Sequence, residues 1–189
     1  GGERMKATGA LKHEHEAIKL MLQIMEAACV QIETEKKVHV ADVDEMIDFL
    51  KVFADQCHHG KEENILFPCL EKAGIPREGG PIGVMLAEHE QGRKYIANMG
   101  RALTDYEDGA ATGLTDLVEN IRSYAELLEQ HINKENNVLF AMADRALTEE
   151  TQDELFEEFE ELEEDVIGRG KHEELHKRLE RLSGTYLKD

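Results

Sequence analysis

The sequence predicts an all-α protein: an up-down-up-down four-helix bundle over residues 1–147, with a helical C-terminal extension over residues 148–189. Apolar residues recur at helical spacing along four long segments, and no segment alternates like a strand. Only three prolines occur, and 33% of the residues are charged, which suits long solvated helices. At 189 residues and 41% hydrophobic, the chain is long enough for one core with an appendage.

The first two helices are expected over about residues 6–36 and from Asp42 onward. The first carries an apolar stripe that includes His15. Asp42 precedes Glu45 by three residues, a spacing typical of a capping box at a helix start. Pro68 is expected to kink or weaken the second helix, since proline removes a backbone donor.

The remaining helices are separated by glycine-containing breaks. A glycine- and proline-rich loop over residues 74–81 leads to a third helix beginning near Pro81. The fourth helix is expected to follow Thr112. Thr148 opens the extension, in which a helix is followed by a break at residues 168–170 and a last helix to about Tyr186.

Charge and cysteine content restrict the partners and the compartment. The formal net charge of −19 disfavours nucleic acid and anionic membrane surfaces as partners. Three cysteines without a CxxC pair favour a reducing compartment over a disulfide framework. No apolar run approaches about 20 residues, and no signal peptide is evident. We therefore expect a cytoplasmic protein, with Met5 as the native start after residues 1–4.

Two ten-residue blocks are near-copies of each other. Residues 58–67 align with residues 131–140 at six identical positions, among them a histidine, the glutamate four residues after it, and a Leu-Phe pair. A Glu-His-Glu triplet centred on His15 likewise matches one centred on His89. The two offsets are 74 and 73 residues, so residues 7–147 are interpreted as one helix pair used twice.

The repeat selects a set of candidate metal ligands. Residues four apart lie on the same face of an α-helix, so each repeated histidine and glutamate should point inward together. The repeat also favours His58 over His59, and Glu62 over Glu63; His59 and Glu63 are expected to be exposed or outside the ligand shell. The predicted ligands are His15, His58, Glu62, His89, His131 and Glu135.

Four imidazoles and two carboxylates are too many for one structural zinc ion, which takes four ligands. The set suits two metal ions, each with two histidines, sharing both carboxylates as bridges. Mixed nitrogen and oxygen ligation favours iron or manganese. Open coordination positions would then accept O₂, NO or peroxide. The alternative is a set of core histidines satisfied by hydrogen bonds to the glutamates.

These motifs resemble those of the hemerythrin-like (HHE cation-binding) family, which implies a four-helix bundle with a non-haem di-iron centre. The matching segments are residues 14–18, 58–68, 88–93 and 131–140. The resemblance implies two iron ions (oxo- or hydroxo-bridged when oxidised), with manganese or zinc as possible substitutes. Oxygen-carrying members have a further histidine where this chain has Arg93. The ligand set is more similar to di-iron proteins that repair iron–sulfur clusters.

Other residues are weaker candidates. Tyr124, two turns before His131, could donate a proton to a bound oxygen species or could simply fill the core. Arg93 could pair with carboxylates that support the ligands. Residues 172–176 match the HExxH zinc-protease pattern, but little chain follows to supply a third ligand; we favour a role for His172 in capping the bundle near the metal layer. The Glu-x-x-His motif of ferritin-type bundles occurs once, at residues 173–176, which disfavours that class.

The sequence thus predicts a protein that binds or reduces a small diatomic molecule or peroxide, in oxygen, nitrosative or redox stress handling or in iron-centre repair. A redox partner would supply electrons. A second hypothesis is a sensor without turnover, in which metal or gas binding shifts the extension over residues 148–189. A third is a structural helical protein with an incidental metal.

Overall fold

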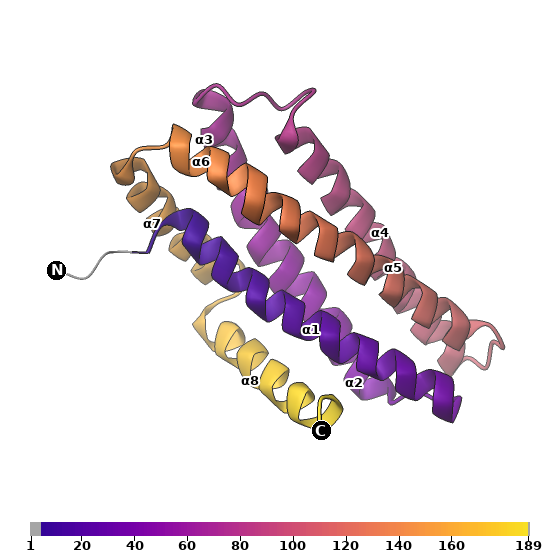
Figure 1. Ribbon diagram of the computed structural model, residues 1–189. Coiled ribbons are helices and arrows are strands. Elements are labelled where there is room, and N and C mark those ends of the chain that lie inside the picture. The colour runs from indigo at the N-terminus through magenta and orange to yellow at the C-terminus, as the bar shows by residue number, and fades with distance from the viewer. Residues whose placement is uncertain (1–4, 189) are drawn as a thin grey trace.

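The structure, a computed structural model, describes residues 5–188, and within that range every regular element is a helix. Four long helices run side by side, and two shorter helices lie along one side of them (Figure 1). The all-α prediction is confirmed. The expectation for residues 1–4 lies outside the described residues.

Two of the four long helices are α-helical throughout, and the other two contain π-helical segments. The first is α1 (Ala7–Glu35), and the third is α4 (Pro81–Glu107). The second consists of α2 (Val40–Phe49), the π-helices η1 (Leu50–His59) and η2 (Glu62–Leu66), and α3 (Phe67–Lys72). The fourth consists of α5 (Gly113–Lys134), the π-helix η3 (Glu135–Leu139) and α6 (Phe140–Ala146). The extension forms α7 (Glu149–Val166) and α8 (Arg169–Tyr186).

The π-helical segments follow the sequence repeat only in part. η2 and η3 occupy equivalent positions, each beginning at the glutamate of the repeated block. η1 belongs to the first copy alone, because the equivalent residues of the second copy lie in the α-helix α5. π-helical turns inside α-helices are rare and are frequent at functional sites.

The apolar core is divided into two clusters by a layer of polar residues. Along α1, Leu11 belongs to the smaller cluster and Ile18 to the larger one, with His15 between them. The other three long helices show the same order, with a histidine or glutamate of the repeat between the two clusters. The bundle therefore holds its polar candidates in the middle of an otherwise apolar interior.

The extension completes both apolar clusters. α7 packs on α1 and on the π-helical segments of the second helix, and α8 packs on α1 and α2. Phe159 of α7 is buried in the smaller cluster, and Leu175 of α8 is buried in the larger one. Thr148 begins α7 as predicted, since its hydroxyl accepts a hydrogen bond from the backbone N–H of Thr151.

The predicted start of the second helix is wrong. It begins at Val40, and Asp42 and Glu45 do not form a capping box. Their carboxylates instead contact α8: Asp42 accepts a hydrogen bond from the hydroxyl of Tyr186, and Glu45 pairs with Arg181. At Pro68 the regular α-helical pattern is interrupted on its N-terminal side by η2 and resumes as α3, which continues to Lys72. No helix within residues 5–188 combines the length and apolar content needed to cross a membrane.

Candidate metal centre

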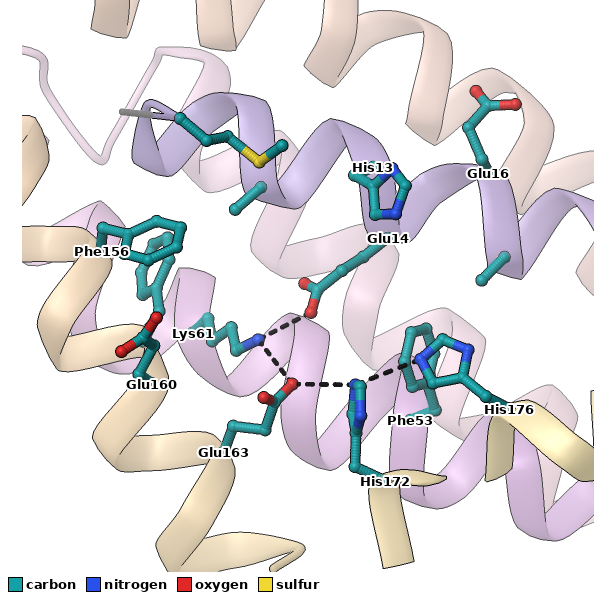
Figure 2. A pocket seen from close by; sticks show the side chains of 14 residues that line it. His13, Glu14, Glu16, Phe53, Lys61, Phe156, Glu160, Glu163, His172 and His176 are labelled. Atoms are coloured by element: carbon teal, nitrogen blue, oxygen red, sulfur yellow. Dashed lines mark hydrogen bonds and ion pairs between the residues drawn. The ribbon is translucent and has the colours of Figure 1, made fainter. Parts of the chain in front are cut away.

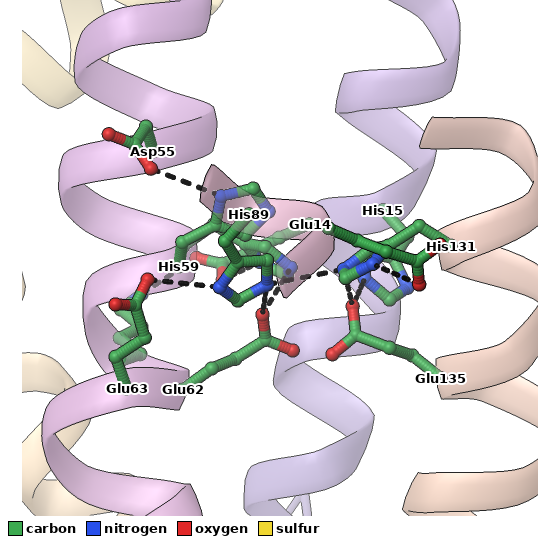
Figure 3. A network of polar contacts seen from close by, with 12 residues as sticks. Glu14, His15, Asp55, His59, Glu62, Glu63, His89, His131 and Glu135 are labelled. Atoms are coloured by element: carbon green, nitrogen blue, oxygen red, sulfur yellow. Dashed lines mark hydrogen bonds and ion pairs between the residues drawn. The ribbon is translucent and has the colours of Figure 1, made fainter. Parts of the chain in front are cut away.

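The six predicted ligands converge from all four long helices on the polar layer. Each is essentially buried, with at most 2% of its surface exposed. Figure 3 shows the carboxylates of Glu62 and Glu135 facing the imidazoles of His89, His15 and His131 across the centre of the bundle. Helices that run side by side bring these residues together although they are up to 120 positions apart in the sequence.

The donor atoms form two groups that share Glu62. The first, called here the His15 group, contains His15, His58, Glu62 and Glu135. The second, called the His89 group, contains His59, Glu62, His89 and His131. Within each group one donor atom of every residue lies within 4.8 Å of those of the others, which is close enough for a single metal ion to be bound between them.

The inner distances link the two groups. His131 Nε2 lies 2.8 Å from Glu135 Oε1 and 3.2 Å from His89 Nε2. Glu62 Oε1 lies 3.2 Å from His89 Nε2 and 3.9 Å from His58 Nε2. His15 Nε2 lies 3.4 Å from Glu135 Oε1. The Nε2 atoms therefore face the two carboxylates, as the donor atoms of a dinuclear site would.

Many of these atoms are buried without a hydrogen bond of suitable geometry. They are Nε2 of His15, His58 and His59, and all four carboxylate oxygens of Glu62 and Glu135. Burying a charged or polar atom without a partner costs on the order of several kcal/mol, so such atoms are rare in folded proteins. Divalent cations would supply the missing partners and cancel the carboxylate charge. The donor set therefore fits metal ions better than a hydrogen-bonded core.

The outward-facing nitrogen of each histidine is held by an oxygen acceptor. His58 Nδ1 donates to Glu14 Oε1 at 2.9 Å, and His89 Nδ1 donates to Glu63 Oε2 at 2.9 Å. His131 Nδ1 donates to Glu88 at 3.3 Å, and His15 Nδ1 donates to the side-chain oxygen of Asn136 at 2.7 Å. Because carboxylate and amide oxygens only accept, the proton stays on Nδ1 and the lone pair of Nε2 faces inward.

Basic residues complete this support. Lys61 donates to Glu14 at 2.6 Å, and Lys134 donates to Glu88 at 2.7 Å. Arg93 pairs with Glu63 and also donates to Asp55 at 3.0 Å. Arg93 thus contacts the carboxylates that hold the histidines, as predicted.

Without metal ions, several of the buried carboxyl and imidazole groups have pKa values far from their usual ones. Burial and the charge of Glu135 raise the pKa of Glu62 well above its usual value. Burial would lower the pKa of His131, but the carboxylate of Glu135 outweighs it and raises that pKa to about 9. Burial lowers the pKa of His58 to about 4, so this imidazole is neutral at pH 7. In the absence of metal ions, protons must compensate the buried carboxylates.

His59 is the residue that the sequence reasoning placed wrongly. It is only 4% exposed and belongs to the His89 group, with its ring stacked on that of His89 at 3.7 Å. Neighbouring side chains of an α-helix diverge by about 100°. In a π-helix more residues make up each turn, so His58 and His59, at the end of η1, both face inward. Asp55 accepts from its Nδ1 at 3.2 Å.

The repeated Leu-Phe pair also has a role at the site. Phe140 stacks on His15 at 5.6 Å between ring centroids, and Phe67 stacks on His89 at 6.1 Å. Each phenylalanine lies on the histidine of the other copy. The aromatic rings therefore restrict the orientation of the imidazoles from the side of the smaller apolar cluster.

Tyr124 and His172 lie farther from the centre. Tyr124 is buried in the larger cluster, where Gly92 leaves room for its ring. Burial and the charge of Asp55 raise the pKa of Tyr124, so its phenol stays protonated. His172 Nε2 lies 3.2 Å from Glu163, which contacts Lys61 at 3.3 Å. His172 is thus connected to the candidate ligand His58 through Glu163, Lys61 and Glu14.

Comparison with known proteins decides the family. The Hemerythrin HHE cation binding domain matches residues 6–143. The chain belongs to this family. It is also similar to an iron-sulfur cluster repair protein YtfE of Edwardsiella ictaluri, at 34% identity over 65% of this chain and 56% of that protein. A second relative, the iron-sulfur cluster repair protein DnrN of Neisseria gonorrhoeae, is 36% identical over 44% of this chain and 55% of that protein.

A third relative is the YtfE of Dickeya chrysanthemi, 36% identical over 46% of this chain and 40% of that protein. The chain therefore spans only about half the length of the curated relatives that it matches. No solved structure matches the chain significantly. Family membership and the buried donor set together identify the chain as a metal-binding protein.

Proposed function

We propose that the chain is a dinuclear iron protein that binds or reduces a small diatomic molecule or peroxide, acting in nitrosative or oxidative stress and in the repair of iron centres. The relatives named as iron-sulfur cluster repair proteins support the physiological part of the proposal. The donor chemistry supports iron, since imidazole with carboxylate suits iron and manganese. Two iron ions would supply one-electron redox chemistry and open positions for a small ligand.

The observation that carries the proposal is the pair of donor groups sharing Glu62, with their buried atoms unpartnered. The predicted site had four histidines. With His59 included, the His89 group offers three imidazoles and the His15 group two. We propose His15, His58, His59, His89 and His131 as ligands, with Glu62 shared between the two groups and Glu135 in the His15 group. The two metal positions would then differ in the number of histidine ligands.

The chain's own residues would set the conditions for a bound ligand. Phe67, Phe140 and the two apolar clusters exclude bulk water from the layer. Tyr124 is held neutral by burial and by Asp55, so its phenol could donate a proton or hydrogen bond but not act as a base. We propose a reducing, cytoplasmic setting, in keeping with the three free thiols.

The test is metal analysis of protein purified anaerobically, followed by optical spectra on addition of azide, NO and O₂. We expect about two iron ions per chain and charge-transfer absorption that changes with these ligands. Consumption of NO or peroxide under reducing conditions would establish turnover. Iron content near zero after anaerobic loading would overturn the proposal.

A sensor without turnover is the second candidate, and one set of contacts favours it. Lys61 donates both to Glu14, which holds His58, and to Glu163 of α7. A change at His58 would therefore reach the C-terminal extension through three contacts: His58–Glu14, Glu14–Lys61 and Lys61–Glu163. Ligand-dependent protection of residues 148–189 from proteolysis, without consumption of the ligand, would favour the sensor over the enzyme.

A further inference from the structure

The C-terminal extension contacts the supports of the metal centre through Glu163 of α7. Glu163 Oε1 accepts a hydrogen bond from Lys61 Nζ at 3.3 Å, and Lys61 Nζ also donates to Glu14 Oε2 at 2.6 Å. The other oxygen of Glu14 accepts from Nδ1 of His58. Figure 2 shows the ammonium group of Lys61 between the carboxylates of Glu14 and Glu163. Glu163 lies outside residues 6–143, which match the family domain, so the extension adds a carboxylate to the supports of that domain.

The burial of Lys61 makes this second carboxylate important. The side chain of Lys61 is 7% exposed, whereas that of its counterpart Lys134, which donates to Glu88, is 45% exposed. An ammonium group has three donors and is strongly unfavourable when it is buried without acceptors. Glu14 and Glu163 supply acceptors on two sides of it. Without the charge of Glu163, we expect Lys61 to turn toward the cavity of about 440 Å³ that these three residues help to line.

Gly60 allows α7 to approach Lys61. A Cβ atom at Gly60 would lie 3.9 Å from a methyl carbon of Leu162, the residue before Glu163. A larger side chain would add atoms beyond this contact. The counterpart of Gly60 in the second copy is Asn133, which is exposed. The first copy therefore has a small residue at the point where α7 packs beside Lys61.

Further contacts fix the carboxylate of Glu163. His172 Nε2 of α8 lies 3.2 Å from Glu163 Oε1, and Cys57 Sγ of η1 donates to the same oxygen at 3.9 Å. The side chain of Glu163 is 28% exposed, so it lies partly within the protein. Glu160, one turn earlier on α7, lines the same cavity but is exposed. The position of Glu163 is thus set by residues of three separate segments.

We propose that Glu163 is a positioning residue of the metal centre: it holds Lys61 against Glu14 and thereby fixes His58 for metal binding. This inference rests on the proposed dinuclear centre and gives the extension a part in it. His58 belongs to the His15 group, so the loss of Glu163 should chiefly affect the metal ion of that group. Three contacts separate Glu163 from His58, so the effect should be smaller than the roughly ten- to hundredfold typical of a direct partner of a ligand.

The experiment compares iron binding by the full chain and by Glu163→Gln, which keeps the shape of the side chain and removes its charge. We expect the affinity for one of the two iron ions to fall by about three- to fivefold, with a changed Mössbauer quadrupole splitting for that ion alone. Glu160→Gln removes an exposed carboxylate of the same helix and is the matched control, which should bind iron as the parent does. Lys61→Met should also weaken binding, and adding Glu163→Gln to it should cause no further loss, because Glu163 acts through Lys61.

The metal-free chain provides a readout that does not depend on iron. In ¹H–¹⁵N NMR spectra, the Nδ1 proton of His58 should give a signal in the parent and in Glu160→Gln, and this signal should be lost through exchange with water in Glu163→Gln. The inference is overturned if Glu163→Gln binds both iron ions as tightly as the parent, or if it keeps the parent's His58 signal. It is also overturned if the double variant binds iron more weakly than Lys61→Met alone. A parent chain that binds no iron would instead overturn the proposed function, and the His58 signal would still test the role of Glu163.

Discussion

The two copies of the helix pair share a ligand frame. In the first copy Lys61 holds Glu14, which holds His58; in the second, Lys134 holds Glu88, which holds His131. Each copy also begins a π-helical segment at its inner glutamate. The repeat therefore builds equal supports for both halves of the centre.

The two copies differ, however, in the second helix, where the first copy has an additional buried histidine. His59 of η1 corresponds to Ile132 of α5, and Asp55, which holds His59, corresponds to Leu128. Thus only the first copy sends a second imidazole inward. The ten-residue π-helix η1, which has no counterpart in the second copy, is what turns it there.

The residues behind His89 and His15 differ in the same sense. Glu63 accepts from His89, whereas its counterpart Asn136 accepts from His15. Arg93 pairs with Glu63, whereas its counterpart Lys19 pairs with an exposed glutamate. A carboxylate makes a histidine a stronger donor than an amide oxygen does. The repeat therefore sets the equivalent ligand positions of the two copies. Substitutions between the copies make the His89 group the more strongly supported half.

The shared carboxylate should produce the largest effect. Glu62→Gln keeps the shape of the side chain but removes the charge common to both groups, so we expect loss of both iron ions. Glu135→Gln should affect chiefly the His15 group. At free iron about 100-fold above the dissociation constant, each lost ion removes about 3 kcal/mol of stabilisation, or roughly 6–12 °C in Tm. Iron analysis and thermal unfolding measure both.

Without metal, the variant Glu62→Gln should no longer be less stable than the parent. Glu62 is buried with neither oxygen hydrogen-bonded, so neutralising it should leave the metal-free chain as stable as the parent or more stable. If Glu62→Gln retained two iron ions and the iron-dependent rise in Tm, the shared role of Glu62 would be wrong.

His59→Ile gives the first copy the residue of the second. We expect iron in the His89 group to bind at least about tenfold more weakly, with iron in the His15 group little changed. Retention of iron during dialysis against a weak chelator, with Mössbauer spectra to distinguish the two ions, measures this. His58→Ile is the matched variant and should weaken the other ion instead. Equal loss in the two variants would argue against two distinct groups.

The repeat explains how much could be predicted from the sequence. The spacing of His58 and Glu62, and of His131 and Glu135, located both inner pairs, because i and i+4 residues share a helix face. The positions between apolar residues also indicated that His15 and His89 face the interior. The structure brings all six predicted donors into one layer.

The rest depended on features that local spacing does not record. His59 was expected outside the ligand shell because the repeat aligns His58, and not His59, with His131. No local sequence pattern predicted the π-helix η1. Asp42 and Glu45 read as a capping box, but α8 uses their carboxylates instead. In each case tertiary contacts decided between locally plausible alternatives.

Arg93→Lys gives the His89 group the basic residue found behind His15. A lysine has no planar fork and cannot hold Asp55 and Glu63 together as the guanidinium does. We expect the affinity for one iron ion to fall by about tenfold, less than for loss of a ligand. Lys19→Ala is the control and should have no effect, since Lys19 pairs with the exposed Glu16 rather than with a side chain that holds a histidine. Iron competition with a chromogenic chelator measures the change; an equal loss in the control would contradict the proposed asymmetry.

The smallest effect concerns the supports that the two copies share. Burial would raise the pKa of Glu14, but its hydrogen bond to His58 and the charge of Lys61 outweigh it and lower that pKa to about 2. A carboxyl whose folded-state pKa is depressed stabilises the fold above its ordinary pKa, here 4.5, and loses that contribution as the pH falls toward 2. Glu14→Gln should therefore cost the metal-free chain about 1–2 kcal/mol at pH 7.

Glu88→Gln tests the equivalent support in the second copy. The pKa of Glu88 is also lowered: burial opposes the shift, but hydrogen bonds from His131 and Lys134 outweigh it. Lys134 is 45% exposed whereas Lys61 is 7% exposed, so solvent screens the second pair more strongly. We expect Glu88→Gln to cost about 1 kcal/mol or less at pH 7.

Urea unfolding of Glu14→Gln, Glu88→Gln and the parent between pH 7 and pH 3 measures these losses of unfolding free energy. Both should shrink as the pH falls below about 4.5, because the carboxyl is then protonated in the unfolded chain, which removes the advantage of the ionised carboxylate in the folded chain. A cost for Glu14→Gln that is unchanged at pH 3 would mean that packing, rather than the charge of Glu14, supports His58.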